Sequence, residues 1–226
     1  MTKQMEDAPN NIVCERTELG SYTCSPQADP MDLGILLELG SIGAGHAATS
    51  LSQVLQQQVC IEIPKIHAIP PHKLPQLYGR HEEPTAAVYM QLSNSECDIL
   101  LMFELTEAKK IAAMMTMAPS IEELDPMMEE SAIQELANIL IGSFLTAISD
   151  FTGVQLLPTP PTGVVDTFDA IIDNFLIKQC LVSDEALIFD TRFKRDGEDA
   201  NSILMIFPSP QLQETLVQKS KELMGI

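Results

Sequence analysis

The sequence predicts a single α/β domain with an internal two-fold, in which two long helices pack against a mostly antiparallel sheet. A pattern of small and polar residues occurs twice, at a constant offset of 97 residues. The tripeptide Asp-Pro-Met also occurs twice, at 29–31 and 125–127, and Leu101–Phe103 resembles Met205–Phe207. These repeats indicate two similar halves. The paired positions are Gly34 and Ser131, Glu38 and Glu135, Ser41 and Asn138, Gly45 and Gly142, Thr49 and Thr146, and Ser52 and Ser149.

Each copy of the pattern predicts a long helix, because its spacings of three and four residues follow the helical period. At about 100° per residue, the second copy falls within a strip of roughly 80° on one helix face. The opposite face is apolar and is expected to join the core. Asp29 and Asp125 as N-caps, each followed by a proline, predict where the two helices begin. The apolar residues are Ile133, Leu136, Ala137, Leu140, Phe144, Ala147 and Ile148.

The first helix contains four glycines, each of which costs about 1 kcal/mol relative to alanine in a helix interior. They indicate the close approach of another backbone, either that of the second helix or that of a partner. The run from 40 to 45 does not follow a predicted strand and lacks the G-x-G-x-x-G spacing, so it does not predict a nucleotide site. The four residues are Gly34, Gly40, Gly43 and Gly45.

The remaining elements follow from short apolar runs bounded by turn residues. Residues 1–28 lack periodicity and predict a loose leader, so the domain is expected at 29–226, with half-repeats at about 29–120 and 125–226. In the first half we expect strands at 59–63 (closed by Pro64), 85–92 and 97–104, then a helix at 106–117. In the second half we expect strands at 154–157, 186–195 and 201–208, then a helix at 209–224.

The composition narrows the classes of partner. The net charge of −19 repels nucleic acid and anionic membrane surfaces. No segment approaches the length of a membrane-spanning helix, and the leader has no apolar signal region, so we expect a cytoplasmic protein that does not insert into membranes. The five cysteines form no C-x-x-C motif, which favours reduced thiols over a zinc site.

Three histidines, His67, His72 and His81, lie in a proline-rich connection. No regular helix or strand is expected to set them on one face. They are therefore interpreted as loop histidines, and no metal site is predicted.

The second copy of the pattern carries a more specific signal. Glu135 and Asn138 form a Glu-x-x-Asn pair, with Ser131 four residues before the glutamate and Pro160 22 residues after the asparagine. This arrangement resembles the signature of the CheC/CheX/FliY family of chemotaxis proteins, which dephosphorylate the response regulator CheY. Residues 38–53 also look like the first copy of this family's pattern. The resemblance covers about residues 31–226, is closest to CheC, and implies a CheC-like fold.

The resemblance implies an aspartyl-phosphate phosphatase acting on a phosphorylated CheY-like receiver. Asn138 would orient the attacking water, and Glu135 would pair with the conserved lysine of the receiver. Ser131, Gly142 and Gly45 would belong to the docking surfaces. The Mg²⁺ ion would be held by the receiver, so the chain needs no cofactor of its own.

The first copy departs from the family pattern, because Ser41 stands at the amide position and Gly34 at the serine position. A serine side chain is shorter than a carboxamide and cannot reproduce its reach. The first surface is therefore expected either to dock a receiver weakly through Glu38 or to contribute only to the structure.

Other interpretations stay open at this point. The strip on the second helix could be a solvated face or a homodimer contact. The chain could be a non-catalytic switch component resembling the middle domains of FliM and FliY. It could also be an adaptor for CheD, the receptor deamidase that CheC-type proteins commonly bind.

Overall fold

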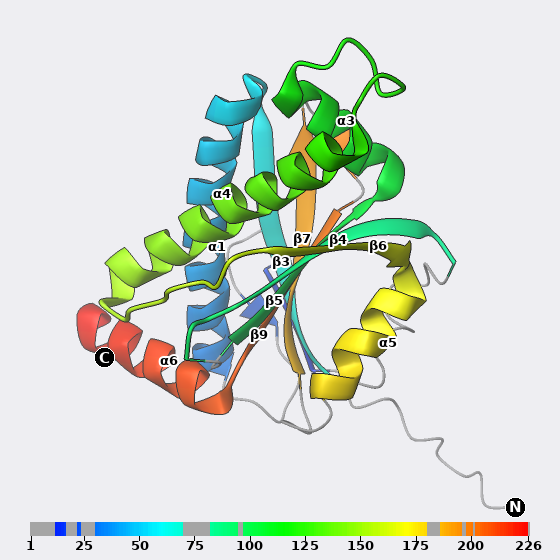
Figure 1. Cartoon of the computed structure of the whole chain (residues 1–226). Helices are drawn as coiled ribbons and strands as arrows, with labels where there is room; N and C mark the ends of the chain where they lie inside the picture. Colours follow the sequence, from blue (N-terminus) through cyan, green and yellow to red (C-terminus); the bar gives the residue numbers. More distant parts are fainter. Residues whose placement is uncertain are drawn as a thin grey trace, which may run out of the picture.

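The computed structural model describes residues 12–16, 22–23, 30–69, 82–94, 97–179, 186–195, 198–200 and 202–225. Figure 1 shows a central set of strands, with two long helices, α1 (Pro30–Leu55) and α4 (Pro126–Thr152), on one side and α5 (Phe168–Gln179) on the other. Two shorter helices, α3 (Leu105–Thr116) and α6 (Pro210–Met224), accompany the long pair. The predicted combination of long helices and sheet is confirmed.

The strands form antiparallel pairs throughout the described residues. A four-stranded sheet has the order β6-β4-β5-β9, and a five-stranded sheet has the order β2-β1-β3-β7-β8. The strands are β1 (Ile12–Arg16), β2 (Tyr22–Thr23), β3 (Val59–Ile69), β4 (Pro84–Gln91), β5 (Cys97–Glu104), β6 (Thr162–Thr167), β7 (Ala186–Arg195), β8 (Glu198–Ala200) and β9 (Ser202–Pro208).

The four-stranded sheet separates two hydrophobic cores, because alternate residues of a strand point to opposite faces. Ile99 and Leu101 of β5 face the larger core, which is shared with α1, α3, α4 and α6. Leu100 and Met102 face the smaller core, which lies beneath α5. The sheet is thus covered on both faces, and the long helices are held by the larger core.

The start of α4 agrees with the predicted cap. The Asp125 carboxylate accepts hydrogen bonds from the backbone N–H groups of Met127 at 2.9 Å and Met128 at 3.3 Å, and Pro126 occupies the first turn. The helix ends at Gly153, whose φ of 72° lies in the left-handed region that favours glycine. Local sequence chemistry therefore fixes both ends of the helix that carries the Glu-x-x-Asn pair.

The two long helices contact each other directly. A Cβ atom placed on Gly43 of α1 would lie 2.6 Å from Cδ2 of Phe144 on α4. A hydrogen bond of 2.8 Å joins the hydroxyl groups of Ser143 and Ser50. Figure 1 shows that α4 crosses α1 obliquely, from its start near α3 to its end near α6. The glycines of the first helix were expected to permit the close approach of another backbone, but at Gly43 the closest group is the side-chain ring of Phe144 on α4.

The described part of the chain has one helix, α4, that could cross a membrane by length and composition alone, whereas no such segment was expected from the sequence. The mean hydropathy of its most apolar stretch is 1.4, but 56% of that stretch is buried inside the protein. Leu136, Ala137 and Leu140 are fully buried there. The apolar character of α4 is accounted for by its place in the core.

The first strand of the repeat is longer than predicted. Strand β3 continues past Pro64 to Ile69, with a shift in its pairing to β7 between Glu62 and Lys65. A proline can be accommodated at such an irregularity, because no ladder hydrogen bond is required from it there. His67 consequently lies on β3 and not in a loop, which corrects the expectation, while His72 and His81 fall outside the described residues.

Two further corrections concern short strands. Residues 154–157 form no strand; Pro158 makes one isolated bridge with Leu92, and β6 begins only at Thr162, after the prolines. Prolines lack the N–H group that a ladder needs, which delays the strand. The N-terminal segment was expected to contain no regular element, but β1 and β2 lie within it, and β1 obtains its hydrogen bonds by pairing with β3.

Candidate functional site

The Glu-x-x-Asn pair lies on the outer face of α4. Glu135 and Asn138 are both exposed, and their spacing of three residues makes them neighbours on the helix surface. Ser131 is exposed one turn earlier, and Gly142 is half-buried one turn later. No atom lies within 4 Å of a Cβ placed on Gly142, so the surface there is open. The structure therefore brings together the four residues that the sequence assigned to this strip.

The opposite face of α4 holds the strip in place. All seven apolar residues predicted for that face are buried, and Leu136, Ala137 and Leu140 have no exposed surface. Closely packed interiors permit little displacement of a helix. Glu135 and Asn138 are therefore presented to solvent from a rigid backbone. The buried set is Ile133, Leu136, Ala137, Leu140, Phe144, Ala147 and Ile148.

Neither Glu135 nor Asn138 forms a hydrogen bond or an ion pair with any residue that the structure describes. An uncharged carboxamide can donate to one group and accept from another without titrating, and a carboxylate can pair with a lysine. Both side chains are thus available to an incoming molecule. Such a pair can bind a cation and position a water at the same surface.

The equivalent strip on α1 differs in its polar groups. Glu38 is exposed, as Glu135 is, and Gly45 is exposed with no atom within 4 Å of a Cβ placed on it. Ser41 is only half-exposed, and its hydroxyl donates to the backbone carbonyl of Leu37 at 2.9 Å. Gly34, at the position equivalent to Ser131, is buried. The strip on α1 therefore retains the carboxylate of Glu38. At the position of the amide it has the Ser41 hydroxyl, which is hydrogen-bonded to the backbone of its own helix.

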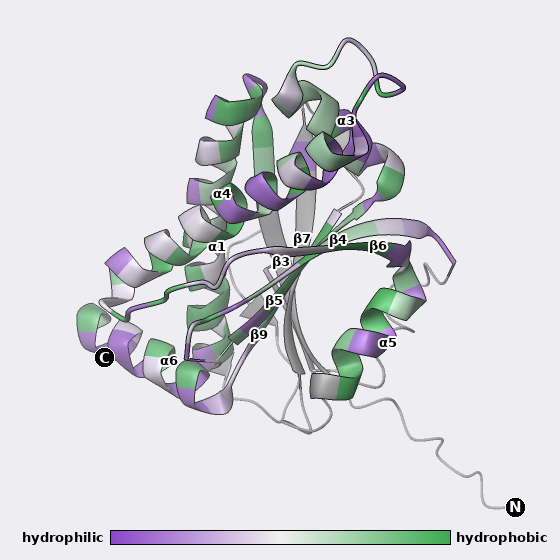
Figure 2. Cartoon of the chain, viewed as in Figure 1, coloured by the Kyte–Doolittle hydropathy of each residue, from purple (hydrophilic) through white to green (hydrophobic). Residues whose placement is uncertain are grey.

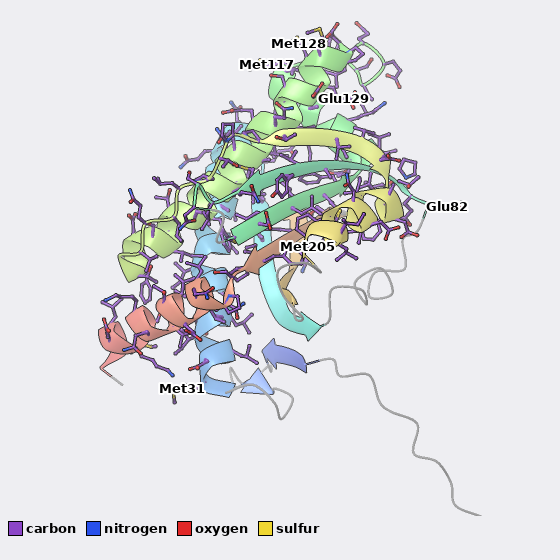
Figure 3. All side chains as sticks on the ribbon, turned by 60° about the horizontal axis from the view of Figure 1, so that its bottom comes forward. Met31, Glu82, Met117, Met128, Glu129 and Met205 are labelled. Carbon is purple, nitrogen blue, oxygen red and sulfur yellow. The ribbon has the colours of Figure 1, made fainter. Side chains whose placement is uncertain are left out.

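Exposed methionines flank both strips, a feature that the sequence analysis did not identify. Met127 is 82% exposed and Met128 is 53% exposed in the first turn of α4, and Met31 is 55% exposed in the first turn of α1. Figure 3 shows Met128 and Met31 at opposite ends of the helix pair. Methionine is flexible and polarizable, which suits an adaptable contact with a partner. The repeated Asp-Pro-Met tripeptide was the available signal, because it places each methionine one turn before its strip.

Groups of three or more histidine, cysteine, aspartate or glutamate side chains in positions to hold a metal ion do not occur among the described residues. Of the cysteines whose side chains are described, Cys60 is exposed and Cys97 is buried. The polar groups of the candidate site are the carboxylate and the carboxamide on α4.

Comparison with known proteins bears on the same helix. The model of the CheC-like family matches residues 128–165, a segment that contains Ser131, Glu135 and Asn138. The CheY-P phosphatase CheC of Bacillus subtilis (strain 168) is 31% identical over 163 residues, which cover 70% of this chain and 78% of that protein. The chain belongs to the CheC-like family. The resemblance seen in the sequence is thereby confirmed.

One further relative and two solved structures are also similar to this chain. The flagellar motor switch phosphatase FliY of Bacillus subtilis (strain 168) is 30% identical over 135 residues, covering 58% of this chain and 35% of FliY. The structure of Thermotoga maritima FliY matches with a TM-score of 0.69 at 19% identity, covering 87% of this chain and 99% of that one. The FliM middle domain from H. pylori matches with a TM-score of 0.61 at 10% identity, covering 85% and 99%. At these identities the two structures show a common fold.

Proposed function

We propose that this CheC-like protein is a chemotaxis phosphatase that hydrolyses the aspartyl phosphate of a CheY-type receiver at the α4 strip. The observation that carries the proposal is the exposed pair of Glu135 and Asn138, without partners among the described residues, on a helix whose other face is buried. The pair lies within the segment matched by the family model. The CheC relative of Bacillus subtilis is a CheY-P phosphatase, which supports the same substrate class.

The reaction needs little covalent chemistry from the enzyme. A water attacks phosphorus, the bond between phosphorus and the aspartate oxygen breaks, and aspartate and inorganic phosphate are formed. The receiver supplies Mg²⁺, which offsets the charge on the phosphoryl oxygens. The carboxamide of Asn138 holds the water in line with phosphorus, because it can accept from the water and donate to a phosphoryl oxygen. The water's proton passes to solvent or to the released phosphate.

Glu135 sets the position of the receiver in this proposal. Its carboxylate pairs with the receiver's lysine, one helical turn from Asn138. Gly142 lets the receiver backbone approach, because no side chain projects there. Ser131 completes the docking surface. A displacement near 1 Å can cost about a hundredfold in rate, so the buried face of α4 contributes directly to catalysis.

We further propose that the two halves of the fold arose by duplication and that only the second retains full activity. Each half begins with a long helix that carries an exposed glutamate and an open glycine on the same strip. Only α4 adds an amide that has no partner among the described residues. The first surface therefore docks a receiver weakly through Glu38. The expected location is the cytoplasm, with the receiver as substrate and CheD as a second partner suggested by the family resemblance.

The test measures phosphate release from a phosphorylated receiver in the presence of the wild-type protein, Asn138→Ala or Ser41→Ala. The matched control is Thr146→Ala, which alters another exposed residue on the α4 strip. Asn138→Ala should reduce the rate by about a hundredfold, because the water loses its positioning group. Ser41→Ala and Thr146→Ala should change it little. Receiver binding is measured in parallel by fluorescence anisotropy. Unchanged receiver lifetime in the presence of wild-type protein, despite binding, would contradict the proposal and favour a non-catalytic switch component or an adaptor.

A further inference from the structure

A groove lies between the N-terminal half of α4 and the outer strand of the four-stranded sheet. Its volume is 380 Å³, and its lining includes Pro126, Glu129, Glu130 and Ile133 from α4 and Val164 and Val165 from β6. Gln134 also lines the groove: its amide nitrogen lies 3.2 Å from a Cβ placed on Gly163 and donates to Glu130 at 3.2 Å. The groove is thus adjacent to the Glu-x-x-Asn strip but lies on another face of α4.

The strand that borders the groove has an unpaired edge. Within the described residues, β6 pairs only with β4 and ends its sheet. Val164 is 47% exposed and Val165 is 59% exposed, although neighbouring residues of a strand point to opposite faces. In Figure 2 the middle of β6 has the green colour of hydrophobic residues. Alternate N–H and C=O groups of an edge strand point away from the sheet and can pair with another strand.

Elsewhere in the same fold, the edge of a comparable strand is paired with another strand. Strand β3 follows the long helix α1, as β6 follows α4, and β3 pairs with β7 on one side. Its other side is covered by β1, with Ile12 opposite Ala68 and Glu15 opposite Lys65 in an antiparallel register. An extended segment therefore completes the sheet at β3. None of the described strands does so at β6.

The charge of the groove indicates what kind of extended segment could bind at β6. Glu129 and Glu130 line it, and no lysine or arginine is among the lining residues in the part of the chain that the structure describes. The chain carries a net charge of −19, so a second copy of this chain would be repelled. Exposed valines favour apolar side chains on the incoming strand. We propose that the β6 edge binds an extended segment of a partner protein, in which basic residues alternate with apolar ones, by antiparallel strand addition.

The test uses the full chain and a short synthetic peptide in which lysine alternates with valine, with a glutamate–valine peptide as its counterpart. Binding is followed by fluorescence anisotropy and by methyl NMR signals of Val164 and Val165. The lysine peptide should bind and shift both signals, while the glutamate peptide should not bind. Glu129→Gln combined with Glu130→Gln should weaken binding about fivefold through the loss of two surface charges. Asp150→Asn, an exposed acidic position near the other end of α4, should leave it unchanged.

Backbone methylation of the peptide separates strand addition from charge attraction. Two versions of the lysine–valine peptide are N-methylated at every second backbone amide. One version is methylated at the lysines and the other at the valines. Strand addition predicts that one of these two peptides loses about tenfold or more in affinity, because its blocked amides face β6. The other methylated peptide should still bind, because its blocked amides point away from β6. Equal binding of both methylated peptides, failure of the unmethylated peptide to bind, or methyl shifts confined to other parts of the protein would each overturn the proposal. None of these readouts depends on phosphatase activity, so the proposed function is tested separately.

Discussion

The ring of Phe144 on α4 fills the space beside Gly43 on α1, where a Cβ atom would lie 2.6 Å from the ring. Phe144 is 2% exposed, so the ring has little room to move. Gly43→Ala should therefore lower the free energy of unfolding by about 1–3 kcal/mol through overpacking. Urea denaturation followed by circular dichroism measures the change. Stability equal to that of the wild type would show that the helices can separate at this point without cost.

Gly142→Ala provides the matched contrast. No atom lies within 4 Å of a Cβ placed there, so the substitution removes the helical penalty of glycine and should stabilise the protein by up to about 1 kcal/mol. The added methyl group lies on the proposed docking surface and should weaken receiver binding. Anisotropy titration with the receiver, beside the same denaturation assay, measures both effects. A stabilised variant that binds the receiver normally would remove Gly142 from the docking surface.

Ser41→Asn tests why the first strip is proposed to be inactive. The serine hydroxyl donates to the carbonyl of Leu37 at 2.9 Å, whereas an asparagine would extend beyond the helix beside Glu38. Phosphate release per molecule should rise, up to about twofold if both surfaces then position a water equally well. The same substitution in an Asn138→Ala background isolates the first surface. Absence of activity in that double variant, with wild-type folding, would show that more than the amide has been lost from α1.

Glu135→Gln tests the docking role of the carboxylate. The substitution keeps the size of the side chain and removes its charge, so receiver binding at low salt should weaken about fivefold. The dependence of affinity on salt should also become shallower, because one screened attraction is gone. Asp150→Asn removes an equal charge from an exposed site on the same helix and serves as the control. Equal effects of the two substitutions would indicate a general response to the protein's charge and no specific pair.

The thiols of Cys60 and Cys97 should differ in reactivity. Burial raises the pKa of the Cys97 thiol, and the nearby charge of Asp98 raises it further, whereas Cys60 is exposed. The thiolate is the reactive form and the alkylating reagent must reach the sulfur, so iodoacetamide should modify the native protein at Cys60 and much more slowly at Cys97. Peptide mass spectrometry after iodoacetamide treatment measures each site, and unfolding should expose both. Native labelling of Cys97 at the rate of Cys60 would contradict the buried placement of β5.

The parts of the fold that the sequence predicted best are those fixed by local chemistry. Asp125 and Pro126 define the start of α4, and the helical period assigns its two faces correctly. The strands at 97–104 and 186–195 coincide with β5 and β7 because their apolar runs end at turn residues. In each case the deciding information lies within a few residues of the element.

The errors occur where pairing with distant residues decides the structure. Strand β3 passes through Pro64 because β7 continues to pair with it on the far side of the irregularity. Strand β1 exists because β3 offers it an edge. The groove beside β6 could not be predicted either, since its walls come from segments that lie apart in the sequence. The position of Glu135 and Asn138 on the same exposed helix face was predicted, because a single helix carries both residues. The exposure of Met127 was not predicted, because it depends on which surfaces the rest of the fold leaves uncovered.

The burial of α4 along its inner face has a kinetic consequence. Because Leu136 and Leu140 are fully buried, α4 is held in place by the core and does not move between turnovers. In the proposed phosphatase cycle, the part that moves is therefore the receiver, which would bind with its phosphate and dissociate without it. No rearrangement of α4 would then be needed between one receiver and the next.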